Sequence, residues 1–295
     1  MPLQSGLKKC MANFTIQPFI SISGVGAASG LHFSNGNVYL ISDKRNMLVE
    51  YNLESAVVKH WPLLPDSSQD NLPKNLKADF EAIAAEGKLL YIFSSGSTEN
   101  RNKLVIFDTE TKSAQARNLD QFYENLRNVA AIEPADFNIE GAAVSENKWF
   151  LLQRGNGPGN KNGLFVFSAN PFKESCEVTF HAIALPEIAG CRASFTDATV
   201  YKDRLFFIAA AEAGNSTYGD GAVAGSLIGS IDLQSLSVQF TTVISPTHKF
   251  EGVSFFEETA NTISFLLCED KDSDETESMI FVLRLNKSPF LQNKS

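Results

Sequence analysis

The sequence predicts an all-β fold, a five-bladed β-propeller with four antiparallel strands in each blade. First, a polar residue stands at the start of a short apolar segment five times, at intervals of 52, 59, 56 and 55 residues. Second, further strand-like segments follow each of these starts, so that the repeating unit is a small sheet. Third, an apolar strand precedes the first unit, while the last unit is one strand short. The five polar residues are Ser29, Glu81, Glu140, Thr196 and Glu251.

The first strand of each unit begins at its polar residue, as in Phe80-Glu-Ala-Ile-Ala-Ala85. A turn rich in Asn, Gly, Lys or Asp comes next, for example Ser34-Asn-Gly-Asn37, and these residues supply the backbone angles of tight turns. A second strand follows each turn. The second strands are expected at residues 38–42, 89–94, 148–153, 204–209 and 262–267.

Third strands are expected at residues 47–53, 103–109, 163–169, 224–233 and 277–285, and fourth strands at 56–64, 113–119, 176–185 and 236–244. The fifth unit has no fourth strand of its own. Because the N-terminal strand at residues 14–22 belongs to no unit, we expect it to complete the last blade and close the ring.

The chain is expected to form one domain, a propeller at residues 14–288, since all-β domains often run long. Residues 1–13 are expected to be disordered or a remnant of cloning, and residues 289–295 a C-terminal tail. The apolar runs are continuous because blades pack on both faces of each sheet. A short helix is expected between residues 118 and 127.

Composition excludes several classes of partner. A net charge of −9 argues against binding to nucleic acid polymers, which requires a basic surface. No apolar stretch approaches the length of a membrane span. The N-terminus lacks the apolar region of a signal peptide, so we expect a cytoplasmic monomer, or a secreted protein if the N-terminus is a cloning remnant. The four cysteines are sparse and favour reduced thiols, although a bridge between Cys176 and Cys191 stays possible.

Radial symmetry would bring the five polar residues to one end of the central axis. The loops between second and third strands would lie at the same end. Their side chains suggest catalytic groups in Asp43, Arg154 and Glu212, with Arg154 also neutralising a phosphate. A small anionic substrate or ligand would be bound by Lys44, Arg45, Arg101 and Lys271.

Three glutamates around one axis repel one another. At roughly 8 Å and an effective dielectric near 20, each pair costs about 2 kcal/mol. A proton, a bound cation, or Arg and Lys side chains that reach in would relieve this repulsion. A hard cation suits the oxygen ligands best, so we expect Ca²⁺, with Mg²⁺ possible. Its ligands would be Ser29, Glu81, Glu140, Thr196 and Glu251. No His or Cys holds any of these positions, which argues against zinc.

The order Ser, Glu, Glu, Thr, Glu resembles that of the calcium-dependent apyrases, the soluble calcium-activated nucleotidases. These are five-bladed propellers whose single Ca²⁺ is held by Ser, Glu, Glu, Ser and Glu at the blade starts. The segments Asn37-Val-Tyr-Leu-Ile-Ser-Asp43, Phe150-Leu-Leu-Gln-Arg154 and Phe250-Glu-Gly-Val-Ser-Phe255 are similar too. The resemblance implies the metal site more than the activity, because the nucleotide-contacting loops do not match.

Three functions follow. The first is a metal-dependent hydrolase of phosphate esters or nucleotides, with Asp43 or Glu212 as base. The second is a non-catalytic scaffold or ligand-binding propeller with a structural cation. The third is a propeller that acts on glycans or lactones. Three glutamates at equivalent positions do not divide into an acid and a nucleophile, which weighs against this third function. Asp197 is an alternative to Thr196 as the inward residue.

Overall fold

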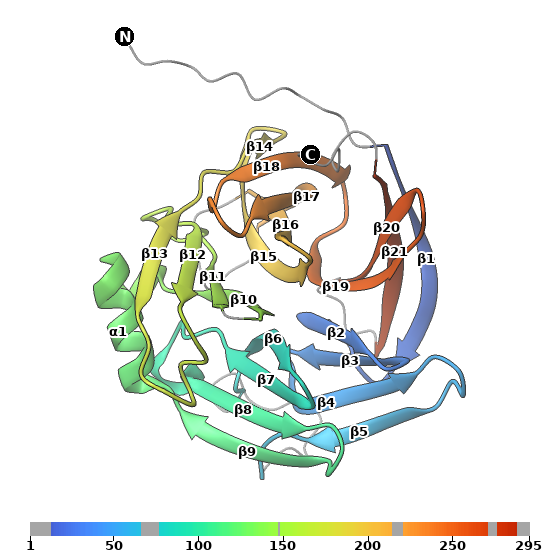
Figure 1. Cartoon of the computed structure of the whole chain (residues 1–295), viewed down its shortest axis with the longest axis horizontal. Coiled ribbons are helices and arrows are strands. Elements are labelled where there is room, and N and C mark those ends of the chain that lie inside the picture. The colour runs from blue at the N-terminus through green and yellow to red at the C-terminus, as the bar shows by residue number, and fades with distance from the viewer. Residues whose placement is uncertain (1–12, 66–76, 147, 214–220, 271–275, 288–295) are drawn as a thin grey trace.

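The computed structural model describes residues 13–65, 77–146, 148–213, 221–270 and 276–287. Their strands form five antiparallel sheets around a common axis, as Figure 1 shows. The predicted five-bladed propeller is therefore confirmed. Blade 1 contains β2–β5, blade 2 β6–β9, blade 3 β10–β13 and blade 4 β14–β18, while blade 5 contains β19–β21 together with β1.

Each blade presents one strand to the axis, and the following strands step outward (Figure 1). The innermost strands are β2 (Gly30–Ser34), β6 (Phe80–Glu86), β10 (Ile139–Ser145), β15 (Cys191–Tyr201) and β19 (Phe250–Glu258). The second strands are β3 (Asn37–Ser42), β7 (Leu89–Ser94), β11 (Lys148–Gln153), β16 (Arg204–Glu212) and β20 (Thr262–Glu269).

The third strands are β4 (Arg45–Asn52), β8 (Lys103–Asp108), β12 (Gly163–Phe167), β17 (Val223–Asp232) and β21 (Glu277–Asn286). The outer strands are β5 (Val58–Pro62), β9 (Ser113–Asn118), β13 (Val178–Ala182) and β18 (Val238–Ser245). Blade 4 gains a short fifth strand, β14 (Glu187–Ile188), which pairs with the start of β15 and was not predicted.

The ring closes through β1 (Phe14–Ser23), which pairs antiparallel with β21 from Phe14 opposite Leu285 to Ser23 opposite Glu277. The register slips between Pro18 and Ile20. A proline at this point is tolerated because β1 is an edge strand. The first and last strands of the propeller thus form one blade, as the sequence predicted.

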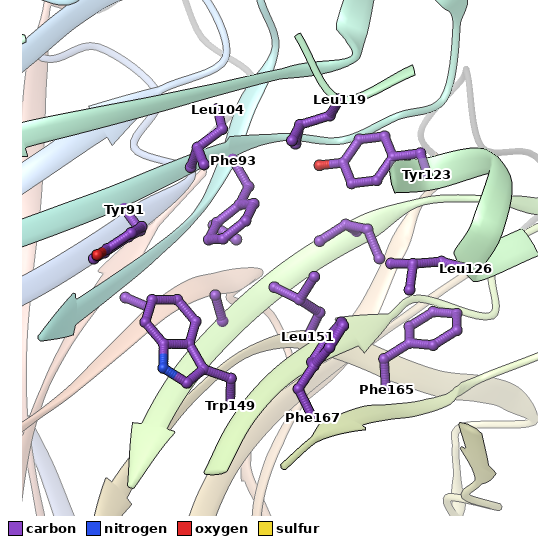
Figure 2. Close-up of a cluster of buried hydrophobic side chains, with 14 of the residues drawn as sticks. Tyr91, Phe93, Leu104, Leu119, Tyr123, Leu126, Trp149, Leu151, Phe165 and Phe167 are labelled. Carbon is purple, nitrogen blue, oxygen red and sulfur yellow. The ribbon is translucent and has the colours of Figure 1, made fainter. Parts of the chain in front are cut away.

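The hydrophobic core consists of layers between neighbouring blades. In the layer between blades 2 and 3, aromatic side chains of β7 and β11 face one another (Figure 2), and Tyr91 and Trp149 lie edge to face at 4.7 Å. Helix α1 (Asp120–Ala130) covers the outer end of this layer with its buried Tyr123 and Leu126. The predicted helix is therefore present, shifted by a few residues toward the C-terminus.

Local chemistry explains several other features. The β2–β3 hairpin turns through Asn35 and Gly36, both with positive φ, as an Asn-Gly pair favours. Short 3₁₀ helices, η1 (Glu99–Arg101) and η2 (Pro134–Asp136), lie at the ends of connecting segments.

Cys176 and Cys191 are free thiols. In the described ranges, no helix is long and apolar enough to cross a membrane.

We predict that Ile22→Ala weakens the closure of the ring. Ile22 is fully buried in β1, in a core layer that also contains Leu266 and Ile280 of blade 5. Truncating a buried isoleucine costs about 2 to 5 kcal/mol. The free energy of unfolding in urea measures this loss. Gln17→Ala, an exposed change in the same strand, is the control, and equal stability of the two variants would contradict a closure that depends on β1 packing.

Candidate functional site

The ring residues lie at irregularities of the innermost strands. In blades 2 to 5, pairing between the first and second strands skips Glu81, Glu140, Thr196 and Glu251, each of which sits in a register shift. Such a bulge leaves one residue outside the ladder and redirects its side chain. The preceding residue is a buried aromatic or isoleucine side chain in each case: Phe80, Ile139, Phe195 and Phe250. The bulge therefore separates a polar axial position from the packed interior.

The two hydroxyl residues of the ring link neighbouring blades. The Ser29 hydroxyl donates to the carbonyl oxygen of Phe80 at 2.5 Å, and the Thr196 hydroxyl donates to that of Phe250 at 2.8 Å. Both acceptors immediately precede the glutamate of the next blade. Asp197, the alternative to Thr196, accepts from the backbone N–H of Val253 at 2.8 Å. Hence all three side chains tie one innermost strand to the next.

Arg154 lies among carboxylates from three blades. Its Nη1 is 3.3 Å from Glu140 Oε1 and 3.8 Å from Glu251 Oε1, while its Nη2 contacts Glu212. The arginine side chain is 4 % exposed. The guanidinium therefore neutralises two ring glutamates, which is one of the three remedies for their mutual repulsion.

Lys249 is a second buried cation, and the sequence did not single it out. Its Nζ lies 2.9 Å from Glu251 Oε1, 3.4 Å from Glu212 Oε1 and 3.7 Å from Asp270 Oδ2. We call Asp79, Glu81, Glu140, Arg154, Glu212, Lys249, Glu251 and Asp270 the axial cluster.

A sequence signal for the missed residues exists. Asp79, Asn138, Ser194 and Lys249 each stand two positions before a ring residue, and successive residues of a strand alternate between its faces. Asn138 Nδ2 donates to Glu140 Oε1 at 2.6 Å. A search for polar residues at this spacing would have added Asp79, Asn138, Ser194 and Lys249 to the predicted site.

Glu81 differs from the other two glutamates. Burial raises the pKa of Glu81 well above its ordinary value, and the nearby Glu140, Asp79, Asp43 and Glu251 carboxylates raise it further. Among the described residues, none is hydrogen-bonded or ion-paired to its carboxylate. For Asp43, burial and the carboxylates of Asp270 and Asp79 raise the pKa to about 6, although Lys77 and Lys44 oppose the shift.

Burial also raises the pKa of Glu140 and Glu251, but cations oppose the shift in both. For Glu140 these are Arg154 and Lys249, and for Glu251 they are Lys249 and Arg154. The three glutamates therefore fall into two classes. Glu140 and Glu251 have cationic partners, and Glu81 has none among the described residues.

Two of the four predicted substrate-binding cations, Arg101 and Arg45, have partners for their guanidinium groups. Arg101 pairs with Asp79 at 2.8 Å and donates to the Ser97 hydroxyl. Arg45 Nη1 donates to the carbonyl oxygen of Gly24 at 3.0 Å. The Lys44 backbone N–H donates to the Ser42 hydroxyl. Lys271 lies outside the described residues.

The calcium site stays a prediction, and the side chains as placed do not fit it. No group of three or more His, Cys, Asp or Glu residues in the described part of the chain could hold a metal ion. The hydroxyls of Ser29 and Thr196 donate to carbonyl oxygens, and Arg154 and Lys249 take up carboxylate oxygens of Glu140 and Glu251. We therefore derive no chemistry through a metal.

Residues 24–285 match the model of a family of unknown function, DUF6929. The chain belongs to this family. The match includes strands of all five blades but leaves out β1 (Phe14–Ser23), the strand that closes the ring. No curated protein matches.

Solved structures share the fold at low identity. A luciferin-regenerating enzyme aligns with a TM-score of 0.52 and 10% identity, over 92% of this chain and 95% of its own. Glutaminyl cyclase from Myxococcus xanthus gives 0.53 and 10%, over 93% and 99%. The PQQ-bound aldose sugar dehydrogenase of Streptomyces coelicolor gives 0.50 and 10%, over 93% and 99%. Enzymes of diverse chemistry therefore share the fold of this chain.

We predict that Arg154→Met destabilises the propeller by about 3 to 5 kcal/mol at neutral pH, since it leaves buried carboxylates without their partner. The loss should be smaller at pH 5, because the pKa values of Glu140 and Glu251 are raised and a protonated carboxyl needs no cationic partner. Urea unfolding at both pH values measures it. Arg117→Met, at an exposed guanidinium that contacts the carbonyl oxygen of Phe172, is the control. Equal losses in the two variants would contradict the role of Arg154.

We predict that Glu81→Gln raises the melting temperature at pH 8 and changes it little below pH 4.5. A carboxyl with a raised pKa in the folded state stabilises the fold fully below its unfolded value, and that contribution is lost as pH rises through the folded pKa. Each kcal/mol corresponds to about 2 °C at this size. Thermal unfolding from pH 4 to 9 tests this, with the exposed Glu54→Gln as control. A Glu81→Gln profile parallel to the wild type would refute the assignment.

Proposed function

We propose that the axial cluster is an acid–base catalytic site that hydrolyses a C–O bond, of the glycosidic or lactone type, in a small polar substrate. The observation that carries the proposal is the unequal environment of neighbouring glutamates. Glu140 is held by Arg154 and Asn138, whereas the strongest electrostatic neighbours of Glu81 are all carboxylates. Pairs of carboxyl groups with such opposed environments divide into acid and base.

In this proposal Glu81 is the general acid and Glu140 the general base. The Glu140 carboxylate accepts a proton from water, whose oxygen bonds to the substrate carbon. The bond between that carbon and the leaving oxygen breaks, and Glu81 donates its proton to this oxygen. Arg154 and Asn138 orient Glu140 throughout. Exchange of protons with solvent restores both residues.

A second candidate is the calcium-dependent hydrolysis of phosphate esters that the resemblance to apyrases implies. One observation favours it: the carboxylates around Glu81 exceed the cations, and a divalent ion would lower their repulsion. Against it, Arg45 and Arg101, which were expected to hold a phosphate, have backbone, hydroxyl or carboxylate partners. We therefore place it second.

The test is a substrate panel assayed with Ca²⁺ and again with chelator. It contains nitrophenyl glycosides, lactones, nucleotides and nitrophenyl phosphate. We expect turnover of a glycoside or lactone that chelator does not abolish. Glu81→Gln and Glu140→Gln should each lower kcat by about 100-fold or more. Glu54→Gln, at an exposed position in the β4–β5 turn, should leave kcat unchanged.

Other outcomes separate the candidates. Phosphate release that requires Ca²⁺ and is lost in Glu81→Gln would support the second candidate and contradict the first. No turnover on any substrate would leave the propeller a binding or scaffold protein. Thermal unfolding of each variant distinguishes lost catalysis from lost folding.

A further inference from the structure

Strand β9 is the exposed outer edge of blade 2. It is the last strand of its sheet and lies on the rim of the molecule (Figure 1). All of its residues, Ser113–Asn118, are exposed, and Arg117 is its one charged residue. A terminal strand presents a row of backbone N–H and C=O groups to solvent, and these groups can pair with another chain.

The pairing of β9 with β8 shows which backbone groups face outward. The register between the two strands runs without a shift, and the N–H of Leu119 donates to the carbonyl oxygen of Asn102. Because hydrogen-bonded and non-hydrogen-bonded pairs alternate in an antiparallel ladder, the backbone groups of Ala114 and Ala116 point away from β8. Within the described ranges, these groups have no hydrogen-bond partner on that side.

The other outer strands carry features that oppose such pairing. β5 ends in Pro62, and β1 contains Pro18 next to a register shift. β18 shifts its register twice against β17, and β13 packs against helix α1 (Figure 1). Prolines, bulges and covering elements block the edges of sheets. β9 has neither a proline nor a register shift, so its edge is open to a further strand.

A groove lies along the face of β9 that is turned toward blade 3. Its volume is about 310 Å³, with Leu89, Tyr91 and Ile106 of the same sheet as its floor and Phe172 of blade 3 as its far wall. Leu89, Ile106 and Phe172 are partly exposed members of the core layer between blades 2 and 3. Gln115 pairs with Ile106 and therefore shares the face of the floor. A strand added to β9 would direct every second side chain toward this groove.

The groove is positively charged at its Arg117 end. Arg117 Nη1 donates to the carbonyl oxygen of Phe172 at 3.3 Å, and no carboxylate pairs with it in the described part of the chain. Asp108, a carboxylate that lines the groove, is compensated by Lys88 Nζ at 3.3 Å and by two backbone N–H groups of its own turn. A carboxylate from a ligand would therefore find a guanidinium partner here.

We propose that the β9 edge binds an extended peptide segment of a partner protein, which pairs with Ala114 and Ala116 as a further strand of blade 2. One apolar side chain of the segment lies in the groove, and an acidic side chain two residues away pairs with Arg117. The main-chain hydrogen bonds supply affinity, and the groove and Arg117 select the sequence. The β9 edge lies on the rim and the axial cluster near the axis, so this proposal does not depend on the proposed function.

The probe is a phage-displayed library of random linear peptides, selected against the whole protein. We expect the selected peptides to carry an apolar residue two positions from an acidic residue. Fluorescence anisotropy measures the affinity of synthetic copies. N-methylation of the alternate amides that face β9 should weaken binding at least about 10-fold, whereas methylation of the other alternate set should not.

Ala116→Pro is the matching change in the protein, because it removes an N–H that faces solvent and keeps the ladder to β8. It should weaken the peptides at least about 10-fold. Ala182→Pro is the control, since Ala182 is an exposed alanine of β13 whose backbone groups also face away from the partner strand. Arg117→Met should weaken the acidic peptides about 3-fold at low salt. Thermal unfolding shows whether each variant is folded.

Each outcome decides the proposal. Equal binding of the peptides to Ala116→Pro and Ala182→Pro overturns it, and so does binding that neither set of N-methyl groups changes. A selection that yields no peptide dependent on Ala116 overturns it as well. If Ala116→Pro does not fold, the N-methylated peptides decide alone. A concentration-dependent dimer in sedimentation that Ala116→Pro abolishes would replace the partner with a second copy of this chain.

Discussion

The site depends on one interaction, the insertion of the Arg154 guanidinium between carboxylates that three different blades supply. Without a cation there, Glu140, Glu212 and Glu251 would repel one another in a poorly hydrated place, and closing the ring would cost energy. Lys249 contributes the same effect from the opposite side, through Glu251 and Glu212. The two cations thus allow several carboxylates to lie close together near the axis. They contact Glu140, Glu212 and Glu251 but not Glu81, so the carboxylates are compensated unequally.

The unequal charge compensation makes the three ring glutamates chemically different from one another. Cations offset part of the rise that burial causes in the pKa of Glu140 and Glu251, whereas the neighbouring carboxylates raise the pKa of Glu81 further. A ring of equivalent residues in the sequence therefore becomes a set of inequivalent groups in the structure. The objection that three similar glutamates cannot divide acid from base no longer holds, since their partners differ.

Much of the fold could be predicted from the sequence because its period is long and regular. The blade starts, the strand order and the closing strand at the N-terminus all follow from segments of continuous apolar residues. The short strand β14 could not be found, because two residues carry no pattern. Helix α1 was placed approximately, since its N-cap residue, Leu119, makes no side-chain capping hydrogen bond.

The candidate site was predicted less completely. Spacing identified the five ring positions, but it says nothing of how far a long side chain reaches. Arg154 was expected to meet a phosphate from its loop and instead pairs with carboxylates of three strands. Lys249 escaped notice because its signal, a polar residue two positions before the ring, appears only when all the blades are aligned.

The bulges at the blade starts have an evolutionary consequence. A residue that the ladder skips has no cross-strand partner to satisfy, so its identity can change while the pairing of its blade is preserved. Four such positions, one in each of blades 2 to 5, lie in the innermost strands. New chemistries can therefore arise at these four positions through single substitutions that leave the pairing of the strands unchanged.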